Sequence, residues 1–133
     1  MSQNPSLADA LRVTAHRLAA DATPYRWTHQ GRCNCGHLAQ TLTSRDAPSI
    51  HAAGLEVDGD WSEHARGFCP TSGLAIDAIL ATMFDAGVTP DELVHLERLS
   101  DPRVLRRLGV SVLDYRERGD VVRYLEAWAA LVA

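Results

Sequence analysis

Apolar residues recur along this chain at intervals of three and four, and no segment alternates apolar and polar residues as a half-buried strand would. Leu7, Leu11 and Leu18 follow this spacing behind Ser6, a residue type that caps helix N-termini. Thr89 and Glu92 bracket a proline at the first helical position, which is a capping box. These signals favour helices over strands and predict an all-α fold.

The expected arrangement is one domain, residues 1–133, folded as a compact bundle of about five helices. The expected helices cover residues 7–21, 35–43 with Asn34 as N-cap, 69–86 opened by Cys69-Pro70, the stretch after Thr89 with a short restart at 102–108, and 117–132. One long irregular connection, over about residues 44–68, holds at most a helical turn at 48–53. A connection of this length is uncommon in a compact domain unless it has a function.

Charge and hydropathy exclude several classes of protein. The net charge is −4 and all 13 basic residues are arginine, so the basic footprint of a nucleic-acid or membrane-surface protein is absent. The N-terminus lacks the pattern of a secretory signal, and residues 74–88 are too short and too acidic to span a bilayer. We therefore expect a cytoplasmic protein with no nucleic-acid and no membrane partner. Three cysteines in such a protein favour metal binding, thiol chemistry or packing over a disulfide framework.

Two cysteines and two histidines lie within nine residues, His29 to His37, together with glycines at 31 and 36. Thiolate and imidazole are the softest and most common transition-metal ligands among side chains. Cys35 and Cys69 are both expected at helix starts, where the helix dipole favours the thiolate. The sequence therefore predicts a metal site made of Cys33, Cys35 and Cys69 and completed by His29 or His37.

Zinc is the first choice of metal, because three thiolates and one imidazole suit a tetrahedral site. An iron–sulfur cluster is the second choice. The spacing is not that of a standard zinc finger, and nothing in it decides between a structural and a catalytic metal, so enzymatic activity stays open.

A second hypothesis keeps the cysteines and removes the metal. Cys35 or Cys69 at a helix start could act as a thiol nucleophile, with His37, His51 or His64 as base, or take part in redox exchange. A third hypothesis is an interaction module in which the cysteines only pack as small buried hydrophobes.

Three further features bear on partners. Trp27 and Trp61 flank the cysteines and could wall a pocket for a small-molecule ligand, with core packing as the alternative. Residues 98–118 hold six arginines against three acids, which would suit an acidic partner or a phosphate, although a solvated face is the more common explanation. The apolar end of the last helix, residues 129–132, is a candidate homodimer contact.

Overall fold

The structure, a computed structural model, describes residues 6–20 and 23–133. Within these ranges the chain forms eight helices and no strand, which confirms the all-α prediction and corrects the expected number of about five. The helices are α1 (Leu7–Ala19), α2 (Asn34–Thr43), α3 (Ala47–Leu55), α4 (Trp61–Arg66), α5 (Ala75–Asp85), α6 (Pro90–Arg98), α7 (Pro102–Leu108) and α8 (Arg118–Val132). In the described part of the chain, no helix has the length and hydropathy that crossing a bilayer requires.

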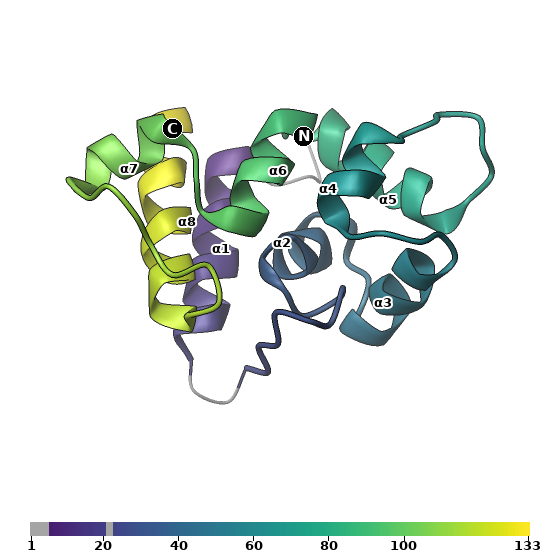
Figure 1. The fold of residues 1–133 in the computed structure, drawn as a ribbon, viewed down its shortest axis with the longest axis horizontal. Coiled ribbons are helices and arrows are strands. Elements are labelled where there is room, and N and C mark those ends of the chain that lie inside the picture. Colours follow the sequence, from purple (N-terminus) through teal and green to yellow (C-terminus); the bar gives the residue numbers. More distant parts are fainter. Residues whose placement is uncertain (1–5, 21–22) are drawn as a thin grey trace.

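The helices form two groups, one of α1, α7 and α8 and one of α3, α4 and α5, and α2 lies between them (Figure 1). The first and last helices, α1 and α8, lie side by side and make the most extensive helix–helix contact within residues 6–20 and 23–133. Helices α3, α4 and α5 lie at the other end of the molecule, and α2 contacts members of both groups. One continuous core of buried apolar side chains runs through the molecule and includes Cys33 and Cys35.

Several helix boundaries are the predicted ones, because their caps form. The Ser6 hydroxyl accepts a hydrogen bond of 3.1 Å from the Asp9 N–H at the start of α1. At α6, the Thr89 hydroxyl accepts from the Glu92 N–H at 3.2 Å, and the Glu92 carboxylate accepts from the Thr89 N–H at 2.9 Å. Asp101 caps α7, which therefore begins at Pro102 as expected. The predicted end of the first helix at residue 21 lies outside the described residues.

The expected irregular connection over residues 44–68 is wrong, because two helices occupy it. Asp46 accepts a hydrogen bond from the Ser49 N–H at 2.9 Å and so caps α3. Asp60 accepts from the Glu63 N–H at 3.1 Å and caps α4. Each aspartate satisfies N–H groups that a helix start leaves unpaired, so short helices form among residues that otherwise favour turns.

The helix expected to open at Cys69-Pro70 begins six residues later, at Ala75. Residues 69–74 form a loop that is tied to the first turn of α5 by the buried carboxylate of Asp77. Asp77 accepts hydrogen bonds from the Cys69 N–H at 3.3 Å and from the Ser72 hydroxyl, which itself accepts from the Leu74 N–H. These bonds replace a first helical turn, so Cys69 is not at a helix N-terminus.

Candidate functional site

The N-terminus of α2 is built on Cys33, which occupies the N-cap position predicted for Asn34. The Cys33 Sγ accepts the Gly36 N–H at 3.4 Å and lies 3.6 Å from the Gln30 carbonyl oxygen, to which the thiol donates. The side chain is buried. A protonated thiol therefore performs the capping role that serine usually performs.

Cys35 and Glu97 meet in the core beneath this cap. The Cys35 N–H donates to Glu97 Oε1 at 3.1 Å, and the Cys35 thiol donates to the Leu93 carbonyl oxygen at 3.3 Å. Burial raises the pKa of both Cys33 and Cys35 well above the ordinary thiol value, and the nearby Glu97 carboxylate raises it further. Burial also raises the pKa of Glu97, against the stabilising hydrogen bond from Cys35. The expectation that a helix start would favour a thiolate at Cys35 is therefore wrong.

Asn34, buried between these cysteines, joins α2 to two other segments. Its side-chain amide donates to the Leu96 carbonyl at 3.1 Å and to the Tyr115 carbonyl at 3.1 Å, and its carbonyl oxygen accepts from the Tyr25 hydroxyl. The start of α2 thus holds the end of α6 and the two loops around residues 25 and 115 in one place. The surface formed by these two loops and the end of α6 therefore depends on the position of Asn34.

His37 is close to the cysteines in sequence but has both ring nitrogens engaged elsewhere. Its Nε2 donates to the Pro24 carbonyl at 2.8 Å, which leaves Nδ1 as an acceptor 3.4 Å from Arg17 Nη1. Burial and the Arg17 charge lower the pKa of His37 to about 4. A neutral, hydrogen-bonded His37 is a structural residue of the α1–α2 contact in this arrangement.

His29 stacks on His51, with ring centroids 3.9 Å apart and an angle of 19° between the rings. Each ring uses Nδ1 to accept a backbone N–H, from Gly31 at 3.1 Å and from Gln30 at 3.0 Å. Lone pairs of imidazole lie in the ring plane, so two nearly parallel rings do not direct their nitrogens at one ion. His64 also has a hydrogen-bond partner, because its Nε2 lies 2.9 Å from the Gln30 side-chain oxygen.

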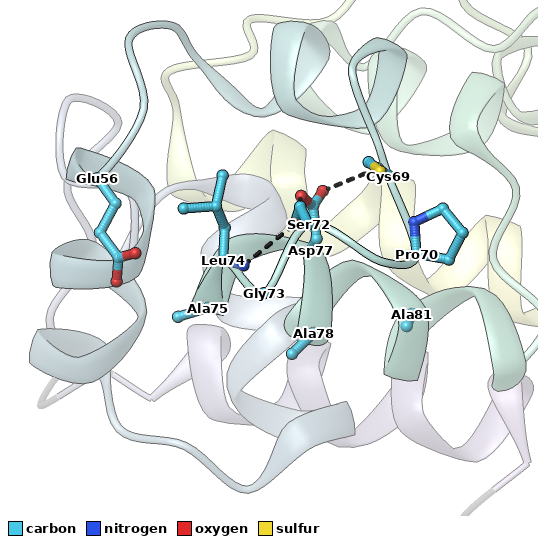
Figure 2. Close-up of a pocket in the computed structure, with 10 residues that line it drawn as sticks. All are labelled: Glu56, Cys69, Pro70, Ser72, Gly73, Leu74, Ala75, Asp77, Ala78 and Ala81. Carbon is cyan, nitrogen blue, oxygen red and sulfur yellow. Dashed lines mark hydrogen bonds between the residues drawn. The ribbon is translucent and has the colours of Figure 1, made fainter.

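Cys69 lies in a different place, beside a surface cavity of about 320 Å³ at the start of α5 (Figure 2). Its side chain is exposed, and the thiol has Thr71 Oγ1 as its neighbour at 3.6 Å. The described residues that line the cavity include the acids Glu56 and Asp77 but no histidine. The thiol therefore has no imidazole base within this cavity.

The structure brings Cys33 and Cys35 together and places Cys69, His29 and His37 in separate surroundings. Over residues 6–20 and 23–133, no three His, Cys, Asp or Glu side chains are grouped so that they could hold a metal ion. The zinc or iron–sulfur site stays a prediction. Glu97 lies beside the two thiols but is not among the metal ligands that the sequence predicts. Its place four residues after Leu93, on the buried stripe of α6, is the sequence signal that could have identified it.

On the surface above the α2 cap, an arginine lies against two aromatic rings. The Arg98 guanidinium carbon is 4.9 Å from the centroid of the Tyr115 ring and 5.5 Å from that of Trp27. The two rings are 5.3 Å apart, and a second guanidinium, that of Arg116, lies 5.5 Å from the Tyr115 centroid. We call Trp27, Arg98, Tyr115 and Arg116 the arginine–aromatic patch.

Backbone contacts hold the patch in place. The Trp27 indole N–H is 3.5 Å from the Glu97 carbonyl oxygen, and Tyr115 is fixed through its own carbonyl by Asn34. The guanidinium groups of Arg98 and Arg116 are exposed, and neither has a carboxylate within 4 Å among the residues that the structure describes. The sequence pointed to Trp27 and to the arginine-rich stretch 98–118 separately, but not to their meeting through Tyr115.

Trp61 is not part of this surface. It is buried in the core at the start of α4, and its indole N–H donates to the Gln30 carbonyl at 2.9 Å. Of the two tryptophans considered as ligand walls, Trp27 alone is partly exposed.

Comparisons of the chain with protein-family models, with curated proteins and with solved structures found no match.

Proposed function

We propose that this chain is a protein-interaction module whose arginine–aromatic patch binds an acidic segment of a partner protein. The observation that carries the proposal is the exposed Arg98 guanidinium held against Trp27 and Tyr115 with no carboxylate partner among the described residues. Tryptophan, tyrosine and arginine are the residue types that most often contribute the binding energy of protein interfaces.

The chemistry of the patch fits a carboxylate-bearing ligand. A guanidinium stacked on aromatic rings keeps its in-plane N–H groups free, and these match the two oxygens of a carboxylate. Because Trp27 and Tyr115 are anchored to Glu97 and Asn34, little conformational freedom remains to be lost on binding. The rings themselves offer apolar area to a neighbouring aliphatic side chain.

Metal binding and thiol catalysis are supported less well by the same structure. The Cys33 and Cys35 thiols donate to backbone carbonyls inside the core, and no histidine is among the described residues that line the cavity of Cys69. Of the hypotheses drawn from the sequence, the interaction module with packed cysteines is the one that this arrangement favours.

The test is a binding titration with a synthetic peptide that alternates glutamate and leucine, followed through tryptophan fluorescence. Arg98→Gln should weaken binding by about tenfold or more, since a bidentate charge-assisted pair contributes roughly 1.5–3 kcal/mol. Arg45→Gln is the matched control, because Arg45 is also exposed but lies two residues after the end of α2, outside the patch. Equal affinity of the Arg98 and Arg45 variants, or no saturable binding by the wild-type protein, would contradict the proposal.

A further inference from the structure

The chain itself carries an exposed acidic segment of the kind that the patch would bind. Residues 55–60, Leu-Glu-Val-Asp-Gly-Asp, run from the last turn of α3 to the N-cap of α4. Leu55 is 64% exposed and Val57 is 37% exposed, although both are aliphatic. We call residues 55–58 the acidic–aliphatic segment.

Within the described part of the chain, the acids of this segment have no arginine partner. Neither Glu56 nor Asp58 has a basic group within 4 Å in the described ranges 6–20 and 23–133. Glu56 lines the cavity beside Cys69, Asp58 lines its smaller neighbour of about 80 Å³, and Leu74 lines both. No arginine is among the described residues that line either cavity, so this face presents negative charge and aliphatic side chains together.

The segment and the patch complement each other in charge and in apolar character. The segment alternates aliphatic and acidic side chains over four residues, whereas the patch places aromatic rings beside exposed arginines. Glu56 and Asp58 would meet Arg98 and Arg116, and the exposed aliphatic side chains would cover the rings. Opposite charge across a contact also fixes its orientation.

Resting on the proposed function, we propose that the partner is a second copy of this chain, and that the acidic–aliphatic segment of one copy docks on the arginine–aromatic patch of another. The contact joins two different surfaces, so each copy can bind one neighbour through its segment and another through its patch. Since the charged groups are exposed, the association should weaken as the salt concentration rises. It is distinct from the contact expected at the apolar end of α8.

Sedimentation velocity over a range of protein concentrations tests the proposal, with two variants of the full chain. Arg98→Gln removes the central charge of the patch, and the double variant Glu56→Gln and Asp58→Asn neutralises the segment without changing its size. Each variant alone should sediment as a monomer where the wild-type protein associates. A mixture of the two should associate again, because the patch of one variant and the segment of the other remain intact.

Circular dichroism and thermal unfolding establish that both variants are folded, which is expected for exposed substitutions. A wild-type protein that stays monomeric at all concentrations would overturn the second-copy proposal. Variants that associate as the wild type does would also overturn it. If association is lost on Leu131→Glu instead, the contact belongs to α8. If the glutamate–leucine peptide still binds through Arg98 while no self-association occurs, the proposed function stands and only the identity of the partner is wrong.

Discussion

Glu97 on α6 accepts a hydrogen bond from the backbone N–H of Cys35 at 3.1 Å, so a carboxylate from one helix closes the N-terminus of another. The next residue, Arg98, is exposed and lies against Trp27 and Tyr115. The buried side chain and the exposed one thus follow each other directly in the chain. The core contact therefore holds the C-terminal end of α6 against the start of α2, and with it the position of the arginine–aromatic patch.

Replacing Glu97 by alanine should destabilise the fold by about 2–4 kcal/mol, because it leaves the Cys35 N–H without an acceptor and opens a cavity. Glu97→Gln keeps an acceptor of the same size and should cost less. Urea unfolding measures both, with Glu126→Ala on the exposed face of α8 as a control expected within about 0.5 kcal/mol of the wild type. Equal losses for the alanine and glutamine variants would show that the hydrogen bond does not matter.

The ionisation of Glu97 should make the free energy of unfolding depend on pH. Its pKa is raised in the folded state, so the folded protein holds the proton more tightly than the unfolded chain. Its contribution to stability is therefore full below the ordinary carboxyl pKa and is lost as the pH rises through the raised value. Between wild type and Glu97→Gln, the difference in unfolding free energy should shift in favour of the variant as the pH rises over that window.

His37 should make the protein less stable in mild acid. Its pKa falls from 6.5 unfolded to about 4 folded, so the unfolded chain binds a proton first. Stability is full above pH 6.5 and is lost progressively as the pH falls toward 4, by about 2–3 kcal/mol from this residue. Thermal unfolding of wild type and His37→Gln across this range should give curves that converge at low pH. Parallel curves would mean that His37 does not titrate as the geometry indicates.

The three thiols should differ sharply in reactivity. Cys69 is exposed, whereas Cys33 and Cys35 are buried and have a raised pKa. A thiol reagent at neutral pH should modify one cysteine quickly in the folded protein and all three in denaturant, with mass spectrometry locating the fast site at residue 69. Fast modification of Cys33 or Cys35 would contradict the buried arrangement.

Elemental analysis of protein purified without chelator or affinity tag tests the zinc hypothesis directly. We expect no stoichiometric zinc or iron, because the thiols of Cys33 and Cys35 already donate to backbone carbonyls. Bound metal that disappears in Cys33→Ser would support the metal prediction and would require a rearranged α2 start.

Two glycines should resist substitution. A Cβ at position 31 would lie 2.0 Å from the Ala47 carbonyl oxygen, and one at position 36 would lie 2.2 Å from the Gln30 carbonyl oxygen. Since backbone must move in both cases, Gly31→Ala and Gly36→Ala should each cost at least about 3 kcal/mol in urea unfolding. Gly67→Ala, whose nearest neighbour would be 3.4 Å away, should be close to neutral. Losses of similar size at all three positions would remove close packing as the cause.

Local capping chemistry made part of this fold predictable. Thr89 with Glu92, and Asp101 before Pro102, satisfy the free N–H groups of a helix start within a few residues, so the sequence alone predicts where α6 and α7 begin. Asp46 and Asp60 cap helices in the same way, but turn formers surround them, so the sequence predicts only a helical turn at 48–53 where α3 lies and no helix where α4 lies. Burial against other helices stabilises such short elements, and a single segment does not show that burial.

The candidate site was less predictable because it depends on contacts between distant residues. The nine-residue cluster predicts a metal site, which stays a prediction, but its cysteines lie beside Glu97, 62 residues from Cys35, rather than beside Cys69. Cys69 itself departs from prediction because the Asp77 side chain accepts hydrogen bonds from the Cys69 N–H and the Ser72 hydroxyl, which hold residues 69–74 as a loop. The patch likewise requires Trp27 and Tyr115 to meet, which no local periodicity encodes.

The two crowded glycines also separate what can vary in this protein from what cannot. Because the contacts at positions 31 and 36 are made by backbone atoms, no compensating side-chain substitution elsewhere can make room for a Cβ. Descendants of the same ancestor should therefore retain both glycines, five positions apart, even where Arg98 or Asp58 has changed and the surface serves another partner. The glycine pair would mark common descent, while the patch and the segment would record how binding has diverged.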